Sequence, residues 1–285
     1  MPLKMKKRII ALIVGAVVFL VLFIWIIWAN KALELNTYTV ESKDLPKSFN
    51  GFRIAHVSDL HNNKMGKNNK KLLDMLRSSK PDIIAITGDL IDSRNTNVNI
   101  ALQFVEEAVK IAPCYYVNGN HEARVSEYAE LKKGLNELGV VVLENEKIEF
   151  ERSGEKINII GVIDPSFKTD YLFGDSTSVM QRNLQILIDV DRYTILLSHR
   201  PELMKIYANN SVNLVLSGHA HGGQFRFPLV GGLFAPSQGL FPEYDSGLYI
   251  EGKTNMIVSR GIGSSIIPLR FNNRPEVILI TLLDK

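Results

Sequence analysis

Hydrophobic positions form one continuous run at the start of the chain. Every residue from Ile9 to Ala29 is apolar or glycine. A helix of about 20 apolar residues is long enough to cross the hydrocarbon core of a bilayer. A cleavable signal has a shorter apolar core of about 7–15 residues and a small-residue cleavage site, for which "IIWANKALEL" is a poor match. Residues 1–30 therefore predict an uncleaved membrane anchor.

Basic residues set the predicted orientation of this anchor. Lys4, Lys6, Lys7 and Arg8 directly precede the apolar run. Positive charge of this kind is typical of the cytoplasmic end of a membrane helix. We therefore expect a single-pass protein of the cell membrane whose remaining residues are extracytoplasmic.

The rest of the chain alternates between two periodicities. Residues 31–52 are polar and contain Pro46 and Gly51, which predicts a tether. From Arg53 onward, short β-rich runs alternate with amphipathic stretches that predict helices over 67–79, 97–111 and 126–138. The β-rich runs are "RIAHVS", "DIIAIT", "CYYVN", "GVVVL", "KINIIGV", "YTILLS" and "VNLVLS", and 247–283 is mostly strand-like. Such alternation predicts a sheet covered by helices, in one folded domain over 53–285.

Composition and charge narrow the classes of function. The chain has 285 residues, and its single cysteine, Cys114, excludes an intramolecular disulfide. Because Cys114 lies in an apolar run, we expect a buried, inert thiol. The whole chain carries 33 basic and 30 acidic residues, but four of the basic ones precede the anchor. The folded part therefore lacks the excess positive charge on which nucleic-acid binding depends, which argues against a nucleic-acid partner.

Polar side chains follow five of the β-rich runs at the point where each run ends. They are Asp59 and His61, Asp89 and Asp92, Asn120 and His121, His199, and finally His219 and His221. In open α/β sheets, functional groups gather beyond the carboxyl ends of parallel strands. Five of the six histidines belong to this set; the exception, His56, lies inside a run and is expected in the core. The sequence therefore predicts that these side chains converge on one edge.

The predicted cluster has the donor chemistry of a metal site. Carboxylate, imidazole and amide oxygen ligands suit divalent ions such as Mn, Fe or Zn. Two ions about 3.5–4 Å apart need a bridging group. Asp89, which follows Gly88 after its own strand, fits that position.

The ordered motifs resemble the calcineurin-like metallophosphoesterase family, in particular a bacterial membrane-associated phosphodiesterase branch. The motifs are Asp59-x-His61, Gly88-Asp89-x-x-Asp92, Gly119-Asn120-His121-Glu122, His199 and Gly218-His219-x-His221, with "SDLH", "LSHRPE" and "GHAHGGQ" typical of the branch. The resemblance covers about 45–285 and implies an αββα sandwich with two metal ions. It implies that Asp59, His61, Asp89 and His221 bind one ion, and Asp89, Asn120, His199 and His219 the other.

The resemblance also implies a mechanism, in which a metal-bridging hydroxide attacks phosphorus. His121 is the expected general acid or charge stabiliser for the leaving alkoxide. Further candidates for supporting a ligand or binding substrate are Asp92, Glu122, Arg200 and Arg270. Glu122 is expected either to orient His121 or to form an exposed ion pair, and both arginines are equally compatible with a surface position.

These observations favour a membrane-anchored, dinuclear phosphoesterase that prefers diesters to monoesters. A cell-envelope nuclease or nucleotide phosphohydrolase is the alternative of the same class, and a non-catalytic metal-binding scaffold is the alternative of another class.

The stretch 30–52 reaches at most about 75 Å when extended at ~3.3 Å per residue, which would keep the site near the bilayer. Residues 222–247 are rich in Gly, Pro and Phe and are either a packed cover or a substrate wall that meets lipid through Phe225, Phe227, Phe234 and Phe241. This favours a phospholipid or lipid-linked phosphodiester as substrate.

Overall fold

Two six-stranded sheets form the centre of the domain. The computed structural model describes residues 3–167, 176–264 and 269–285. The first sheet has the order β1 (Glu34–Ser42), β16 (Glu276–Asp284), β2 (Arg53–Val57), β3 (Ile83–Thr87), β4 (Cys114–Val117) and β5 (Val141–Val142). The second has the order β14 (Gly247–Glu251), β15 (Thr254–Val258), β9 (Leu214–Ser217), β8 (Thr194–Leu197), β7 (Glu155–Gly161) and β6 (Glu146–Arg152).

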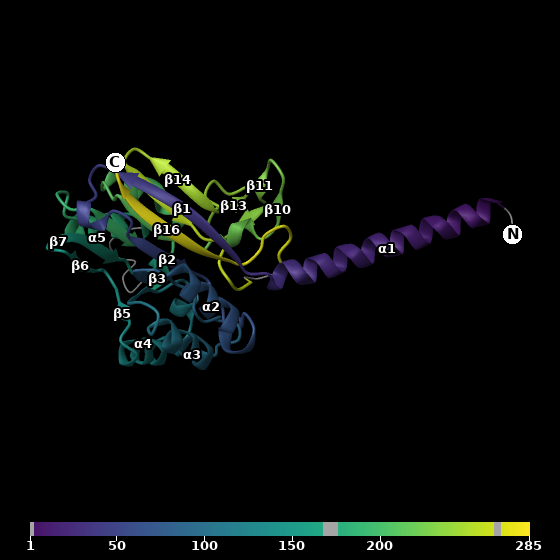
Figure 1. Cartoon of the computed structure of the whole chain (residues 1–285), viewed down its shortest axis with the longest axis horizontal. Helices are drawn as coiled ribbons and strands as arrows, with labels where there is room; N and C mark the ends of the chain where they lie inside the picture. Colours follow the sequence, from purple (N-terminus) through teal and green to yellow (C-terminus); the bar gives the residue numbers. More distant parts are fainter. Residues whose placement is uncertain (1–2, 168–175, 265–268) are drawn as a thin grey trace.

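The central strands of both sheets are apolar on both faces because each sheet is covered on both sides. On β3, Ile83 and Ala85 point into the core between the two sheets, whereas Ile84 and Ile86 point toward the helices. The helices on this outer face are α2 (Lys70–Ser79), α3 (Val98–Ala108) and α4 (Tyr128–Glu137), close to the three predicted ranges. On the second sheet, α5 (Ser176–Leu187) and α6 (Met204–Asn209) pack on the outer face. The four layers confirm the predicted αββα sandwich (Figure 1).

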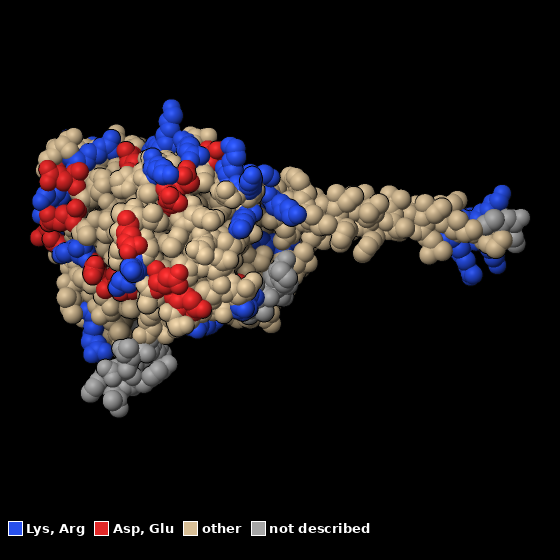
Figure 2. All heavy atoms as spheres, turned by 90° about the horizontal axis from the view of Figure 1, so that it is seen from below, with Lys and Arg blue, Asp and Glu red and all other residues tan. Residues whose placement is uncertain are grey.

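A single long helix projects from the domain. Helix α1 (Leu3–Lys31) lies outside the four layers, and most of its apolar side chains are exposed, except near the domain, where Ala29 is buried (Figure 1). Over Lys4–Lys31 it is long and apolar enough to cross a membrane. Lys and Arg side chains lie at both of its ends, with an uncharged stretch between them (Figure 2). This is the arrangement that the sequence predicts for an anchor.

The segment after α1 differs from the predicted tether. Residues 34–42 form β1, which pairs in parallel with β16 from Glu34↔Glu276 to Ser42↔Asp284. Further along, Phe49 and Phe52 are buried in the core between the sheets. Polar residues such as Asn36 and Thr37 lie on both faces of this edge strand and obscured it in the sequence. Only Ala32 and Leu33 separate the helix from the sheet, so the segment belongs to the folded domain.

Candidate metal centre

The predicted ligands follow strands β2, β3, β4, β8 and β9, as expected. The pairs β2–β3, β3–β4 and β8–β9 are parallel, so their carboxyl ends meet at one edge of each sheet. Several ligands have left-handed backbone conformations, which non-glycine residues rarely adopt: Asp59 (φ 53°), His61 (φ 47°), Asp89 (φ 52°), His219 (φ 67°) and His221 (φ 49°). Such strain is typical of functional sites, where the surrounding structure holds the residue in place.

The first cluster contains Asp59, His61, Asp89 and His221. All four are buried, and one ligand atom from each lies within 4.8 Å of the others. The Nε2 atoms of His61 and His221 lie 3.1 Å apart. The Oδ1 atom of Asp59 lies 3.3 Å from His221 Nε2, and Oδ2 of Asp89 lies 3.5 Å from His61 Nε2. Imidazole nitrogens and carboxylate oxygens therefore converge on one point, as a cation would require.

The second cluster contains Asp89, His199 and His219. The Nε2 atom of His199 lies 3.2 Å from Asp89 Oδ2 and 3.2 Å from His219 Nδ1. The Nδ1 atom of His199 lies 2.7 Å from the carbonyl oxygen of Thr87, to which it donates. That contact holds a proton on Nδ1 and turns Nε2 toward Asp89 and His219, which is the orientation in which an imidazole can bind metal.

Asn120 adds an amide oxygen to the donor set. Its Oδ1 atom is buried and has no hydrogen-bond partner among the described residues. A buried acceptor without a partner is costly and calls for an ion or a water molecule. The donors therefore fit divalent metal ions, and Asp89 belongs to both clusters. The assignment of individual ligands to two ions remains a prediction.

The surroundings of the two clusters set the charge of their carboxylates and imidazoles. Burial alone would raise the pKa of Asp89, but the neighbouring His199 holds this pKa well below its ordinary value. Burial lowers the pKa of His221 to about 3, which keeps the imidazole neutral and able to bind a cation. The two carboxylates, Asp59 and Asp89, thus supply the negative charge that a cation would neutralise.

Glycines allow the close approach of the ligand loops. Gly88 has a φ of 87°, and a Cβ atom there would lie 2.8 Å from His199 Nδ1. Gly261 has a φ of 69°, and a Cβ atom there would lie 2.6 Å from the Cβ of Asp59. Gly119 and Gly218 are equally crowded, by Asp89 and Asp59 respectively. The glycine in three of the sequence motifs therefore makes room for a carboxylate or an imidazole.

His121 lies beside the first cluster with a defined tautomer. Its ring centroid is 4.4 Å from that of His61. The Nδ1 atom accepts a hydrogen bond from the backbone N–H of Ser93 at 3.0 Å. Because a backbone N–H can only donate, the neutral ring carries its proton on Nε2. Burial lowers the pKa of His121 to about 4, so the ring is neutral near pH 7. This residue is therefore prepared to donate a hydrogen bond through Nε2.

Glu122 has a different environment from either of the two that the sequence suggested. It is fully buried and accepts backbone N–H groups of Asp89 (2.8 Å), Gly119 (2.7 Å) and Ile91 (3.2 Å). Burial, with help from the charge of Asp89, raises the pKa of Glu122 to about 7. The carboxyl group thus joins the loops after β3 and β4 and shows no hydrogen bond to His121.

Asp92 lies behind two histidines. Its Oδ2 is 3.8 Å from His61 Nδ1, and its Oδ1 is 3.7 Å from His121 Nδ1. Arg94 binds the same carboxylate through its backbone N–H and its Nε, each at 2.9 Å. Neither distance is that of a hydrogen bond, so Asp92 supplies negative charge beside the two rings, and one ligand atom from each of His61, Asp92 and His121 lies within 4.8 Å of the others. The supporting role of Asp92 remains a prediction.

Arg200 is buried and contacts His219. It forms a two-pronged ion pair with Asp164, through Nε to Oδ2 at 2.6 Å and Nη2 to Oδ1 at 2.8 Å. Its Nη1 lies 2.9 Å from His219 Nε2 and 3.0 Å from Ser237 Oγ. Sequence analysis missed Asp164 and Ser237, because neither follows a strand in a recognisable motif. Both hold the second cluster in place through Arg200.

We expect Arg200→Met to lower the free energy of unfolding by about 3–5 kcal/mol, because it leaves the carboxylate of Asp164 buried without its partner. Urea unfolding followed by circular dichroism, with chelator present to remove any metal contribution, measures this. The matched control is Arg192→Met, which breaks a partly exposed pair with Glu149 and should cost about 0–1 kcal/mol. Equal losses in the two variants would contradict the role of the Arg200–Asp164 pair.

Arg270 is not on the surface. It is almost completely buried, and its guanidinium donates to the carbonyl oxygens of Arg260 (2.7 Å) and Gly263. Burial lowers the pKa of Arg270 to about 10, an effect that the charge of Asp59 opposes. The side chain therefore shapes the loop that packs on Asp59.

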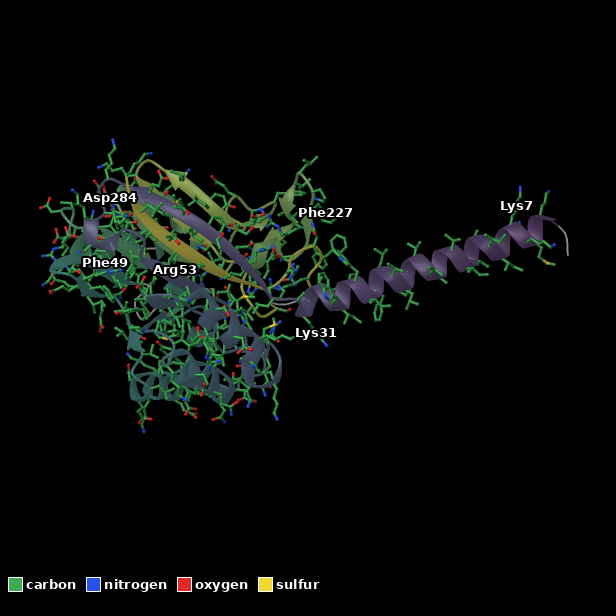
Figure 3. All side chains as sticks on the ribbon, viewed as in Figure 1. Lys7, Lys31, Phe49, Arg53, Phe227 and Asp284 are labelled. Atoms are coloured by element: carbon green, nitrogen blue, oxygen red, sulfur yellow. The ribbon has the colours of Figure 1, made fainter. Side chains whose placement is uncertain are left out.

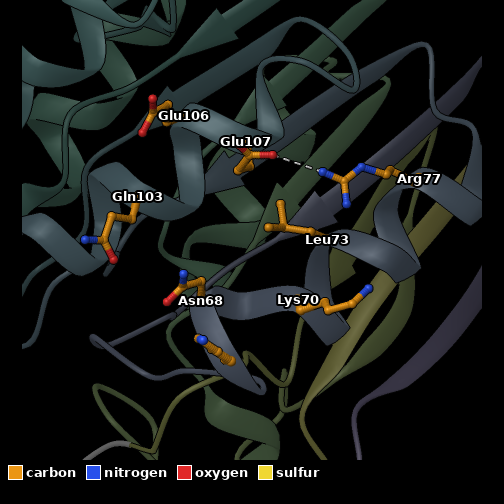
Figure 4. Close-up of a pocket in the computed structure, with 8 residues that line it drawn as sticks. Asn68, Lys70, Leu73, Arg77, Gln103, Glu106 and Glu107 are labelled. Atoms are coloured by element: carbon orange, nitrogen blue, oxygen red, sulfur yellow. Dashed lines mark hydrogen bonds and ion pairs between the residues drawn. The ribbon is translucent and has the colours of Figure 1, made fainter.

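A separate surface groove lies between α2 and α3 (Figure 4). It has a volume of about 490 Å³, and its lining includes Lys70, Arg77 and Glu107. The Arg77 guanidinium lies 3.1 Å from the Glu107 carboxylate, and Lys70 pairs with Asp74. None of the predicted site residues lines this groove.

Comparison with known proteins identifies the family. The model of the calcineurin-like phosphoesterases matches residues 52–223. The uncharacterized metallophosphoesterase YkuE of Bacillus subtilis is 31% identical over 257 residues, covering 88% of this chain and 85% of that protein. An uncharacterized metallophosphoesterase of Aquifex aeolicus is 31% identical over 262 residues, covering 89% of this chain and 93% of that protein.

Two further similarities concern the anchor and the fold. A bovine transmembrane protein with a metallophosphoesterase domain is 29% identical, and the match covers 87% of this chain but 56% of that protein. The crystal structure of TT1561 of Thermus thermophilus superposes with a TM-score of 0.51 at 13% identity, covering 74% of this chain and 90% of that one. The second likeness supports the fold alone. Given the family match and the relatives that share nearly its full length, the chain belongs to the calcineurin-like phosphoesterase family.

Proposed function

We propose that the protein is a phosphoesterase that uses two divalent metal ions and prefers diesters to monoesters. The observation that carries the proposal is the Asp89 carboxylate, which both buried histidine clusters share. Two bound ions, Mn, Fe or Zn, would polarise the phosphoryl oxygens and supply a hydroxide nucleophile near neutral pH. Asp59, His61 and His221 would hold one ion, and Asn120, His199 and His219 the other, with Asp89 between them.

Within this proposal, His121 assists departure of the leaving group. Its Nδ1 is occupied by the Ser93 N–H, so the neutral ring can donate a hydrogen bond through Nε2 that stabilises a developing alkoxide. The backbone N–H of Ser93 fixes the orientation of this ring, and the Asp92 carboxylate lies 3.7 Å from its Nδ1. The protein therefore needs no nucleophile of its own.

The way in which the two arginines are engaged supports a preference for diesters. Arg200 is bound to Asp164, and Arg270 to the carbonyl oxygens of Arg260 and Gly263. Apart from the buried Nε of Arg270, which has no partner among the described residues, their N–H groups are largely engaged by protein, which leaves little to bind the additional negative charge of a phosphomonoester dianion. This supports a diester substrate over a monoester.

The proposal is tested with paired chromogenic substrates. We expect the full chain, purified in detergent and supplied with Mn, to hydrolyse a nitrophenyl phosphodiester faster than nitrophenyl phosphate, and chelator to abolish both activities. Reconstitution with Fe and Zn extends the test to the other candidate ions. Bound metal without hydrolysis of either ester would instead favour the non-catalytic scaffold.

We further propose that α1 anchors the protein in the cell membrane with the domain on the extracytoplasmic side. The four basic residues before the apolar stretch support this orientation. Only Ala32 and Leu33 separate α1 from β1, so the site is held closer to the bilayer than a 23-residue tether would allow. Confinement raises the effective concentration of substrates embedded in the same bilayer, which favours a phospholipid or lipid-linked phosphodiester.

A further inference from the structure

A short hairpin after the metal histidines carries exposed apolar side chains. Strands β10 (Arg226–Phe227) and β11 (Gly231–Gly232) are joined by a tip that contains Leu229 and Val230. Leu229 is fully exposed, Val230 is 56% exposed and Phe227 is 43% exposed. Apolar residues concentrated at one loop tip mark a surface that contacts a partner or a membrane.

The conformation of Leu229 makes its exposure more unusual. The tip is a turn in which the Val230 N–H donates to the Phe227 carbonyl oxygen at 3.2 Å. Leu229, at the third position of this turn, has a φ of 68°. Turns with positive φ at that position favour glycine, because a side chain there is strained. A leucine at this position strains the backbone and exposes an apolar side chain to water. Both costs are explained if the side chain contacts a partner or a membrane.

Aromatic contacts connect this hairpin with α1. The Phe227 ring centroid lies 6.0 Å from that of Phe271, which in turn lies 5.6 Å from that of Trp25 in α1. Leu269, 39% exposed, belongs to the same loop as Phe271, and its carbonyl oxygen accepts a hydrogen bond from Gln224. Together, Phe227, Leu229, Val230 and Leu269 form what we term the juxtamembrane patch.

The patch lies at the end of the domain where α1 joins it. Figure 1 shows β10 and β11 beside the base of α1, and Figure 3 shows Phe227 at the Lys31 end of the domain, with Asp284 at the other end. Asn30 fixes this arrangement: its Oδ1 accepts the Arg270 backbone N–H at 2.8 Å, and its Nδ2 donates to the Arg270 carbonyl oxygen at 2.9 Å. The Arg274 guanidinium also lies 5.2 Å from the Trp28 ring centroid.

We infer that the juxtamembrane patch inserts into the leaflet from which α1 emerges, so that the domain binds the lipid surface directly as well as through its anchor. Trp25 and Trp28, in the last turns of α1, are at the depth where aromatic residues mark the bilayer interface. Because Phe271 contacts Trp25, the neighbouring patch lies at the same depth. Lys and Arg side chains gather at this end of the domain, which suits anionic headgroups (Figure 2).

The same segment reaches the metal centre. After β11, strands β12 (Phe234–Ala235) and β13 (Gly239–Leu240) form a second hairpin, whose tip carries Ser237. Ser237 Oγ lies 3.2 Å from Nε2 of His219. One stretch of chain therefore contacts a predicted metal ligand at one point and presents apolar side chains to the bilayer at another. Insertion of the patch would hold the site facing the leaflet.

Site-directed spin labelling of the full chain tests the inference. Leu229→Cys would be labelled with a nitroxide and reconstituted in vesicles of phosphatidylethanolamine and phosphatidylglycerol. Cys114 can stay, because burial raises its thiol pKa to about 12 and hides it from the reagent. We expect the label to collide with oxygen more often than with a water-soluble nickel chelate. Val230→Cys repeats the measurement at a position that is not strained.

Two reference labels separate the possible outcomes. Ile186→Cys, on α5 and 80% exposed, is the matched apolar control and should report water; Leu20→Cys, within α1, should report the bilayer interior. The inference rests on the proposed anchoring of α1, so an aqueous environment at Leu20 would overturn both. A lipid environment at Leu20 with an aqueous one at Leu229 and Val230 would overturn the patch alone. Dipolar broadening at Leu229 without contact with lipid would also overturn it, in favour of a contact between copies of the chain.

Discussion

Asp89→Asn is expected to lose both metal ions and to abolish hydrolysis of phosphodiesters. The Asp89 carboxylate is the group that the two histidine clusters share, with Oδ2 3.5 Å from His61 Nε2 and 3.2 Å from His199 Nε2. An amide of the same size removes the negative charge and leaves one oxygen in place of two. Metal content measured by elemental analysis, together with turnover of the chromogenic diester, gives the result.

The control for this variant is Asp74→Asn. Asp74 is an exposed carboxylate on α2 that pairs with Lys70 and Arg77, so its loss should leave metal content and activity unchanged. Circular dichroism should show both variants folded. If Asp89→Asn retained two ions per chain, the shared role of this carboxylate would be wrong.

His121→Ala is expected to keep both ions and to slow turnover by roughly 10²–10³-fold, the usual effect of removing one hydrogen-bond donor to negative charge that develops in the transition state. The decrease should be smaller for a nitrophenyl leaving group than for an alkyl one, because nitrophenolate delocalises its negative charge. Rates with the two leaving groups, measured at saturating Mn, provide the test. Loss of metal from this variant would instead show that His121 is a ligand.

Ser93→Ala is the matched control for His121. It removes the hydroxyl 3.1 Å from His121 Nδ1 but keeps the backbone N–H that fixes the tautomer. The loss of one such contact corresponds to about 0.5–1.5 kcal/mol, or at most roughly tenfold in rate. A decrease as large as that of His121→Ala would mean that the hydroxyl, rather than the backbone, sets the tautomer.

Sequence reasoning predicted the ligand loops because their signal is local. A β-branched run that stops at Asp-x-His or His-x-His defines both the strand and the side chains at its end, so the structure brings Asp59, His61, Asp89 and His221 together as expected. Asp164 has no such signal. Its importance depends on Arg200, which is distant in sequence and becomes its partner only in the folded domain.

Two other differences have the same cause. The role predicted for Glu122 was inferred from its position next to His121. In the structure its carboxyl group instead accepts hydrogen bonds from the backbone of a loop some 30 residues earlier in the chain. Every second residue of β1 is exposed, as in an edge strand, but its polar residues do not alternate. Its partner β16 comes from the opposite end of the sequence. Contacts between residues far apart in the sequence cannot be recognised from the hydrophobic pattern of a short segment.

The direct passage from α1 into β1 gives the junction mechanical strength. A pull on the anchor acts along β1, whose ladder with β16 runs from Glu34↔Glu276 to Ser42↔Asp284. In a parallel pair the hydrogen bonds are evenly spaced along the strands, so a force along the axis loads them together in shear rather than one after another. Arg274 adds a clamp at the loaded end, through Nε to the carbonyl oxygen of Ala32 at 2.9 Å. With α1 anchored as proposed, tension between the bilayer and the domain would therefore load the whole β1–β16 ladder at once.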